Sequence, residues 1–256
     1  MDTLDRMDLT LDTIKDVKIY QKKKGYRFSI DAPLLSGFVK PLFSGRAADI
    51  GAGSGIIGLL LAKKYEKLTV QLFEIQEELY ALSLENIRLN GVEDRVSALN
   101  ADVKDLLLPE VSKCPYIGSN SFDIVVSNPP FRKIGTGLIN PHVEKAVARH
   151  ELELTLDDLT RAAFCLLRGK GRFYFIHHPT RFIEAIDALR DRGLQPVRAR
   201  FVHSDESAWA KMFLMECVKE GKPTFTLENP FYIYKTDGSY TEDTLALLGS
   251  TRLESD

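Results

Sequence analysis

The sequence predicts an α/β fold in which a mostly parallel sheet carries helices on both faces. Strand-like and helix-like segments alternate from about residue 46 to residue 203, a pattern typical of parallel strands joined by crossover helices. A glycine-rich turn at residues 51–55 directly follows the first of these strands. The last two strand-like segments have no helix between them, so we expect them to form an antiparallel hairpin.

The first half of this region is expected to contain four strands and two helices. Helices are expected at 56–64 and 77–89, and Asn90-Gly91 closes the second one because such residues tolerate the left-handed conformation at a helix end. Runs of apolar and β-branched residues predict the strands at 46–50, 68–74, 96–101 and 122–127.

The second half is expected to add two helices and three strands. A helix at 156–167 ends at Gly169, and a helix at 181–190 ends at Gly193. The three strands are expected at 172–177, 196–202 and 211–218. Because the last two read as a hairpin joined by residues 203–208, they predict one antiparallel edge of the sheet.

Three regions are expected along the chain. Residues 1–45 form an N-terminal extension with a hairpin-like run at 16–20 and a helix at 32–38. Residues 46–235 form the main domain. The remainder, 236–256, is a polar tail that we expect to be partly ordered at best.

Composition narrows the class of protein. The chain of 256 residues has 44% hydrophobic and 27% charged residues, which are ordinary globular values. Its formal net charge of -2 means that binding to nucleic acid would require a local basic patch. Cys114, Cys165 and Cys217 lack the spacing of a zinc site or disulfide framework. Reduced thiols, no signal-like N-terminus and no membrane-length apolar run predict a soluble cytoplasmic protein without a metal.

The glycine-rich turn indicates a nucleotide-like ligand without phosphate. Its glycines are Gly51, Gly53 and Gly55, a G-x-G-x-G spacing that differs from the G-x-G-x-x-G of dinucleotide folds. Glycines here allow a tight turn and a close approach of the backbone to a ligand. Asp49 precedes the turn by two residues and would repel a pyrophosphate, but it can neutralise an ammonium group.

Two more acids follow the next two strands. Glu74 ends the second strand and can accept hydrogen bonds from two ribose hydroxyls. Asp102 follows the third strand and can accept one from the exocyclic amine of adenine. The carboxyl ends of parallel strands bind ligands in open α/β sheets. A ligand with an amine, a ribose and an adenine is S-adenosylmethionine, which we expect as the cofactor.

Asn128-Pro129-Pro130-Phe131 directly follows the fourth strand. Asn128 offers a side-chain carbonyl, and the two prolines hold the loop extended with backbone carbonyls free to accept hydrogen bonds. Phe131 supplies a flat apolar face. The tetrapeptide therefore predicts a clamp for a planar amino group, with two acceptors for its protons and one ring to stack on the attached plane.

These motifs, in this order, resemble the class I S-adenosylmethionine-dependent methyltransferases that modify amino nitrogens. The upstream block at residues 25–35, GYRFSIDAPLL, is similar to a bacterial subfamily that methylates N6 of an adenine next to the anticodon of a valine tRNA. Arg149-His150-Glu151 is similar to the same subfamily. The resemblance covers roughly residues 15–235 and implies a Rossmann-like, seven-stranded sheet whose last strand is antiparallel.

The resemblance also implies a mechanism and a set of site residues. The sulfonium methyl would pass in line to adenine N6, while the Asn128 side chain and the Pro129 carbonyl hold the protons of a nitrogen that becomes positive. No metal or nucleophilic residue is needed. The catalytic residues would be Asn128, Pro129, Pro130 and Phe131. The cofactor-binding residues would be Arg27, Asp31, Asp49, Gly51, Ala52, Gly53, Gly55, Glu74, Ile75, Asp102, Val103 and Asn128.

The expected substrate is RNA, most simply a tRNA. Phe131 would stack on the target base, a contact worth about 1–3 kcal/mol in single-strand binders. The basic residues expected to contact phosphates are Lys22, Lys23, Lys24, Arg132 and Lys133.

Four other functions stay open at this point. One is DNA adenine methylation, which is disfavoured because the sequence shows no separate target-recognition domain. The same clamp occurs in enzymes that methylate the glutamine amide of a protein, but those enzymes have a helical N-terminal domain for which residues 1–45 are too short. Enzymes that methylate guanine N2 in ribosomal RNA tend to have His where this chain has Arg132. An RNA-binding factor that keeps the fold without catalysis is the alternative from another class, and the intact Asn128 and cofactor acids disfavour it.

Overall fold

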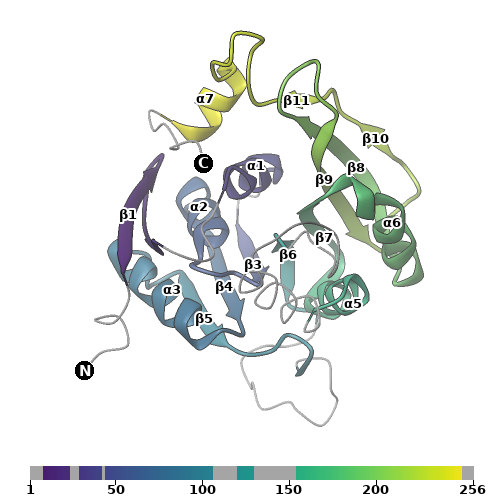
Figure 1. Cartoon of the computed structure of the whole chain (residues 1–256). Helices are drawn as coiled ribbons and strands as arrows, with labels where there is room; N and C mark the ends of the chain where they lie inside the picture. Colours follow the sequence, from purple (N-terminus) through teal and green to yellow (C-terminus); the bar gives the residue numbers. More distant parts are fainter. Residues whose placement is uncertain (1–7, 24–28, 42–43, 106–119, 130–153, 250–256) are drawn as a thin grey trace, which may run out of the picture.

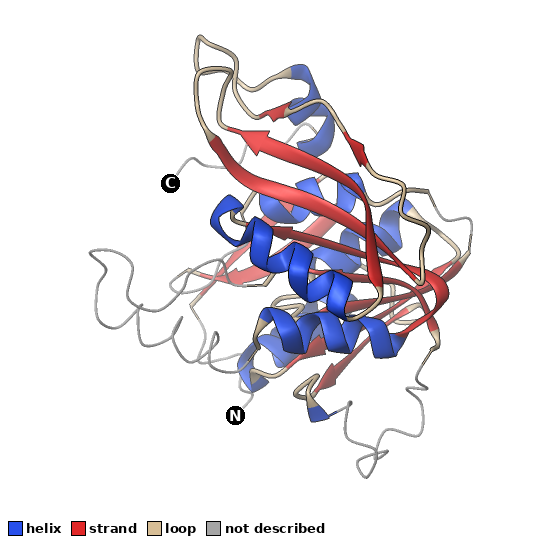
Figure 2. Ribbon diagram, turned by 90° about the vertical axis from the view of Figure 1, so that its right-hand side faces the viewer, coloured by secondary structure: helices blue, strands red, loops and turns tan. Residues whose placement is uncertain are grey.

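The computed structural model describes residues 8–23, 29–41, 44–105, 120–129 and 154–249. Within these residues a twisted central sheet is covered by helices on both faces (Figure 1). Figure 2 shows the same layers turned by 90°. The α/β, Rossmann-like class predicted from the sequence is confirmed.

The central sheet has nine strands in the order β10-β8-β9-β7-β6-β3-β4-β5, and β11 also pairs with β8. All pairings are parallel except those of β9, which is antiparallel to both neighbours. The strands are β3 (Gly45–Ile50), β4 (Leu68–Glu74), β5 (Val96–Asn100), β6 (Phe122–Ser127), β7 (Leu167–His177), β8 (Leu194–His203), β9 (Ala210–Lys219), β10 (Thr226–Leu227) and β11 (Phe231–Tyr232).

The antiparallel strand lies inside the sheet, so the expectation of an antiparallel edge was wrong. β9 pairs with β7 on one side and with β8 on the other. The crossover through α6 places β8 two positions from β7, and the hairpin then returns β9 into the position between them. Two short parallel strands, β10 and β11, follow along the outer edge of β8.

Two groups of helices cover the two faces. The buried side chains of α1 and α2 belong to one apolar cluster, and those of α5 and α6 belong to another. None of the helices in the described part of the chain is long and apolar enough to cross a membrane. The helices are α1 (Asp31–Phe38), α2 (Ile56–Lys64), α3 (Glu77–Leu89), α5 (Leu156–Leu166), α6 (Phe182–Asp191), α7 (Glu242–Leu248) and the short 3-10 helix η3 (Pro179–Arg181).

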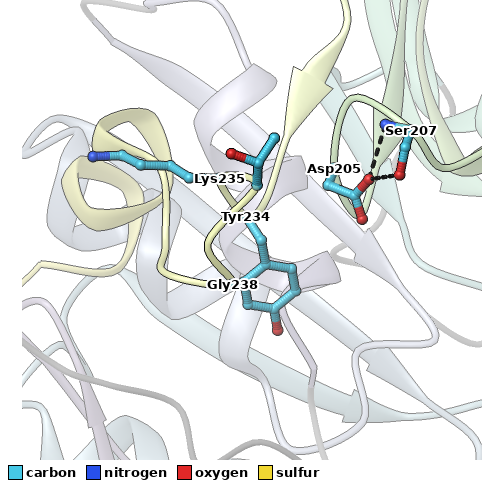
Figure 3. Close-up of a pocket in the computed structure, with 6 residues that line it drawn as sticks. Asp205, Ser207, Tyr234, Lys235 and Gly238 are labelled. Carbon is cyan, nitrogen blue, oxygen red and sulfur yellow. Dashed lines mark hydrogen bonds between the residues drawn. The ribbon is translucent and has the colours of Figure 1, made fainter.

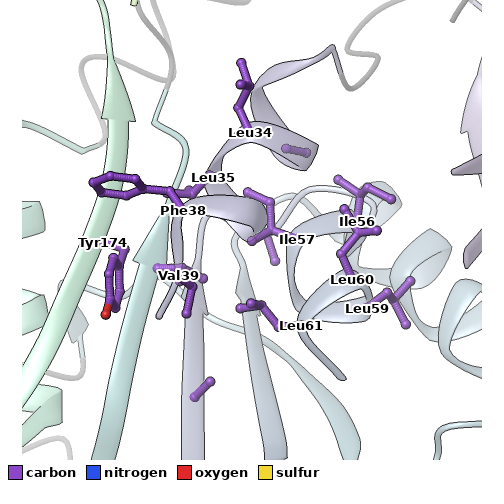
Figure 4. Packing of buried hydrophobic residues seen from close by; sticks show 14 of the residues in the cluster. Leu34, Leu35, Phe38, Val39, Ile56, Ile57, Leu59, Leu60, Leu61 and Tyr174 are labelled. Carbon is purple, nitrogen blue, oxygen red and sulfur yellow. The ribbon is translucent and has the colours of Figure 1, made fainter. Parts of the chain in front are cut away.

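The first cluster fixes α1 and α2 against the strands (Figure 4). Phe38 at the end of α1 meets the buried Tyr174 of β7 edge-on, with ring centroids 6.2 Å apart. The Arg198 guanidinium of β8 lies 3.6 Å from the centre of the Phe38 ring and donates a hydrogen bond of 2.6 Å to the Phe38 carbonyl. Arg198 also forms an ion pair with the fully buried Glu216. These contacts fix the helix that precedes β3.

Both ends of the described chain pack on this face. The hairpin of β1 (Leu9–Ile14) and β2 (Val17–Lys22) buries Ile14 and Val17 completely in the cluster that holds α1 and α2. In the polar tail, α7 begins with the side chain of Thr241 as its N-cap. Its last residue, Leu248, is fully buried, and its carbonyl accepts a hydrogen bond from the N–H of Lys15 at the hairpin turn. Residues 242–248 thus form a helix within the tail, which the composition predicts to be partly ordered at best.

Candidate active site

The glycine-rich turn connects β3 to α2 at the carboxyl edge of the sheet. Gly51, Gly53 and Gly55 all have left-handed φ values, of 68°, 56° and 89°, which glycine adopts at little cost. The N–H groups of Gly51 and Ala52 both donate to the carbonyl of Phe73 in β4, at 2.9 and 3.0 Å. A Cβ placed on Gly51 would meet no heavy atom within 4 Å. The turn is therefore anchored on one side and open to a ligand above Gly51.

Glu74 holds the same turn from the end of β4. The residue is 4% exposed, and its Oε2 accepts a hydrogen bond from Gly53 N–H at 2.7 Å. Its Oε1 accepts one from Gln76 N–H at 2.9 Å. Each oxygen of an ionised carboxylate can accept more than one hydrogen bond. Glu74 can therefore fix the turn and still receive two hydroxyl donors from a ligand.

Asp49 is a buried acid with one free oxygen. It has no exposed surface, and its Oδ2 accepts a hydrogen bond from Gly58 N–H in α2 at 3.0 Å. Its Oδ1 is buried and has no hydrogen-bond partner among the described residues. Burial, together with the nearby charge of Glu74, raises the pKa of Asp49 to about 7. An unpaired buried acceptor is costly, and a cationic donor on a ligand would satisfy this one.

The third acid follows β5, beside Glu74. The N–H of Ala101 donates a hydrogen bond to the carbonyl of Glu74, the last residue of β4. Asp102 is the next residue after Ala101. Asp102 Oδ1 accepts from Lys104 N–H at 2.8 Å, and its Oδ2 lies 3.6 Å from Lys104 Nζ. Val103 is buried, whereas Ile75 is 38% exposed directly after Glu74. An exposed isoleucine between two acids offers an apolar surface for a ring.

Asn128 leaves β6 directly beside the end of β3. Ser127 pairs with Ile50 across the two strands, and its hydroxyl donates to the Ile50 carbonyl at 2.9 Å. Asn128 Oδ1 is buried and has no hydrogen-bond partner among the described residues, and Pro129 is buried next to it. Adjacent strands thus end in two unpaired acceptor oxygens, one on Asp49 and one on Asn128.

The other predicted site residues lie on α1, on the N-terminal hairpin or outside the described chain. Asp31 begins α1, where burial raises its pKa. Lys22 forms an ion pair with Glu78 of α3, and Lys23 forms one with Asp8 at 2.5 Å. Those that lie outside the described residues are Lys24, Arg27, Pro130, Phe131, Arg132 and Lys133, together with Cys114 and the run Arg149-His150-Glu151.

Three polar residues of this region were not identified from the sequence. Ser127 joins the clamp to β3 through the Ile50 carbonyl. Asn100 donates from Nδ2 to the carbonyls of Glu74 and Ile75, at 2.9 and 3.0 Å. Asn86 of α3 donates to the Ser54 carbonyl inside the glycine-rich turn. A buried asparagine within the apolar side of a helix is the one signal that would have identified Asn86.

The structure has a hollow that is lined by none of the predicted site residues (Figure 3). It lies between the turn that joins β8 to β9 and the turn that follows β11. There Asp205 accepts hydrogen bonds from the N–H and the hydroxyl of Ser207, at 2.8 and 2.5 Å. The residues that line the hollow are Asp205, Ser207, Tyr234, Lys235, Thr236 and Gly238. The described residues contain no group of three or more His, Cys, Asp or Glu side chains arranged to hold a metal ion.

Comparison with known proteins agrees with this geometry. Residues 30–154 match the methyltransferase small domain family. A protein of Pedobacter heparinus named tRNA1(Val) (adenine(37)-N6)-methyltransferase is 27% identical over 234 residues, which cover 91% of this chain and 94% of that protein. Relatives from Dyadobacter fermentans and Porphyromonas gingivalis bear the same name.

Solved structures with the same fold include a predicted O-methyltransferase from Agrobacterium tumefaciens. It has a TM-score of 0.69 at 24% identity and covers 85% of this chain and 94% of its own. The glycine-rich turn, the acids at the strand ends, the family match and the fold lead to one conclusion. The chain is a methyltransferase with a Rossmann-like fold, and its residues 30–154 match the methyltransferase small domain.

Proposed function

We propose that this protein transfers a methyl group from S-adenosylmethionine to the exocyclic N6 amine of an adenine in RNA, and that this RNA is a tRNA. The observation that carries the proposal is a pair of buried acceptors at the ends of adjacent strands, Asp49 Oδ1 and Asn128 Oδ1, which have no hydrogen-bond partner within the described part of the chain. One fits the ammonium of the cofactor and the other fits an amine of the substrate. The names of the relatives support the choice of adenine and of tRNA.

The residues around the turn fit the parts of S-adenosylmethionine. When bound, this cofactor supplies an electrophilic methyl group on a sulfonium. Asp49 would hold its ammonium, and Glu74 would accept from the two ribose hydroxyls while it keeps its bond to Gly53. Ile75 and Asp102 would receive the adenine ring and its amine. The open space above Gly51 gives the ligand room to approach the backbone.

Asn128 would act on the nucleophile. The lone pair of adenine N6 is delocalised into the ring, so the free amine is a poor nucleophile. The Asn128 side-chain oxygen and the Pro129 carbonyl would accept its two protons, orient the lone pair and stabilise the charge that develops on nitrogen. The bond from Ser127 to Ile50 would keep these acceptors at a fixed position relative to the cofactor turn.

Competing substrates are weaker fits. The described part of residues 1–45 is a two-stranded hairpin and one helix, an arrangement that differs from the helical domain of the glutamine-amide methyltransferases. Arg132 stands where the guanine-N2 enzymes tend to have His. A binding factor without catalysis would have no need of the unpaired acceptor on Asn128.

Cysteines without disulfide spacing support a cytoplasmic location, where tRNA is modified.

The test is a methylation assay that offers several substrates to the full chain. Total tRNA, ribosomal RNA, a protein extract and duplex DNA are each incubated with radiolabelled S-adenosylmethionine. We expect incorporation into tRNA, with N6-methyladenosine identified by mass spectrometry of the nucleosides. Incorporation confined to the protein extract would establish the glutamine alternative, and N2-methylguanosine in ribosomal RNA would establish the guanine alternative. No incorporation with intact cofactor binding would favour the non-catalytic factor.

A further inference from the structure

Two asparagines on α3 hold the free edge of the N-terminal hairpin. Asn90 Oδ1 accepts from Lys18 N–H at 2.9 Å, and its Nδ2 donates to the Lys18 carbonyl at 2.6 Å. Asn86, one helical turn earlier, makes the same pair of bonds to the N–H and carbonyl of Tyr20, at 2.7 and 3.0 Å. The two side-chain amides therefore bond to the backbone of β2 in the way that a neighbouring strand would.

The two asparagines differ in their third hydrogen bond. Asn90 donates its remaining proton to the carbonyl of Asn86, within its own helix, at 2.7 Å. Asn86 donates its remaining proton to the carbonyl of Ser54, at 3.0 Å. Ser54 stands between Gly53 and Gly55 in the turn at the end of β3. Asn86 is fully buried, and its one acceptor and two donors are all used.

The proposal builds on the function proposed above. We infer that Asn86 is a positioning residue that couples the N-terminal hairpin to the cofactor-binding turn. The hairpin docks on α3 through Asn86, and the same amide sets the direction of the peptide between Ser54 and Gly55.

The turn needs such an anchor because its glycines are flexible. Among the described residues, groups on β4 and α3 hold the turn, namely the Phe73 carbonyl, the Glu74 carboxylate and the Asn86 amide. Loss of the third would leave the buried Ser54 carbonyl unpaired and would allow the turn to populate conformations that do not bind the cofactor. By linkage, a ligand that holds the turn also strengthens the docking of the hairpin.

Asn86→Ala and Asn90→Ala form a matched pair for the test. Each removes one pair of bonds to β2, but only Asn86→Ala removes the bond to Ser54. We expect both variants to lose Tm, and Asn86→Ala to lose more because Asn86 is fully buried and its removal leaves the Ser54 carbonyl unpaired. The Kd for S-adenosylhomocysteine, measured by isothermal titration, should rise by about tenfold in Asn86→Ala, as for one lost hydrogen bond, and stay within about twofold in Asn90→Ala.

A third variant tests the two N–H donors of the Asn86 amide separately from its oxygen acceptor. Asn86→Asp keeps the size of the side chain and an acceptor for Tyr20 N–H, but it cannot donate to Ser54. It should therefore weaken cofactor binding as Asn86→Ala does. Equal Kd values in wild type, Asn86→Ala and Asn86→Asp, with only Tm reduced, would show a merely structural role and overturn the inference.

Hydrogen exchange of the wild-type protein tests the coupling even where a variant fails to fold. Saturation with S-adenosylhomocysteine should slow exchange of the Tyr20 amide more than that of the Lys18 amide, because only Tyr20 is joined to the turn through Asn86. Equal slowing at the two amides, or none at either, would contradict the coupling. Failure of the wild type to bind S-adenosylhomocysteine would instead overturn the proposed cofactor, and the inference with it.

Discussion

The backbone N–H of Gly53 donates a hydrogen bond of 2.7 Å to the carboxylate of Glu74. The acid at the end of β4 thus fixes the turn that follows β3, 21 residues earlier in the chain. A residue that would bind the ribose also shapes the backbone around the cofactor, so its removal should affect both contacts together.

Glu74→Gln should weaken cofactor binding strongly. The change removes the charge and places an NH2 group where one carboxylate oxygen accepts from a backbone N–H. Hydrogen bonds to charged groups contribute about 1.5–3 kcal/mol, so the Kd for S-adenosylhomocysteine should rise by about 10- to 100-fold in isothermal titration. Glu77→Ala, an exposed acid in the first turn of α3, is the control. Equal affinities of Glu74→Gln and wild type would refute the role of Glu74.

Burial of Asp49 should make stability depend on pH. Its pKa is about 7 in the folded protein against 3.8 for the free side chain, so the folded state holds the proton more tightly than the unfolded state. Protonation of Asp49 therefore stabilises the folded state fully below about pH 4, and this stabilisation is lost as pH rises through 7. Asp49→Asn keeps the acceptor for Gly58 N–H and does not titrate.

The measurement is urea unfolding of both proteins between pH 4 and pH 8. The free energy of unfolding of Asp49→Asn, relative to wild type, should increase over this range by on the order of 4 kcal/mol. Because other titrating groups are shared by the two proteins, their effects cancel in the difference. A difference that does not vary with pH would mean that Asp49 ionises in the folded protein as it does in the unfolded chain.

Asn128→Ala should reduce the rate of methyl transfer far more than the affinity for the cofactor. Its side-chain oxygen would act on a charge that appears only in the transition state, and the loss of such a group costs about 10²–10³ in rate. Asn128→Asp retains an acceptor oxygen and should keep more activity than Asn128→Ala. Single-turnover rates at saturating cofactor are the measurement. A rate within a few-fold of wild type in Asn128→Ala would rule out the clamp mechanism.

The sequence was sufficient to predict the features whose signals come from neighbouring residues. Strand β4 and helices α2 and α3 begin and end where the sequence predicts, because apolar periodicity and end signals such as Asn90-Gly91 depend on neighbouring residues. The acids at the strand ends were identified for the same reason. The position of a residue after a buried strand already places it at one edge of a parallel sheet.

Features that depend on distant residues were not predicted. Asn86 meets Tyr20 and Ser54, which are 66 and 32 residues away in sequence. β7 begins at Leu167, before the predicted 172, because its first residue pairs with Phe122 across an irregular register. Helix α7 is short, and it is held by the buried Leu248, whose carbonyl accepts a hydrogen bond from the N–H of Lys15. Each of these contacts exists only once the chain has folded.

The basic residues at the hairpin should give RNA binding a modest dependence on salt. With a net charge of -2, only a local patch can meet phosphates, and about three to five contacts would give a log–log slope near −2 to −4. Joint change of Lys22, Lys23, Lys24, Arg132 and Lys133 to Ala should weaken tRNA binding and flatten this slope without changing the Kd for S-adenosylhomocysteine. An unchanged slope would remove these residues from the RNA-binding surface.

The role of Lys22, which forms an ion pair with Glu78, can also be tested by a variant that should strengthen RNA binding. The Lys22 side chain is 26% exposed and its partner Glu78 is 62% exposed, and an exposed pair of this kind contributes at most about 1 kcal/mol. A phosphate can therefore replace Glu78 as the partner of Lys22. Glu78→Gln frees Lys22 and removes a negative charge that repels RNA, so tRNA should bind more tightly and with a steeper salt slope. Glu77→Gln, its exposed neighbour without that pair, removes the same charge and is the control. If the two variants bind tRNA alike, Lys22 does not contact a phosphate.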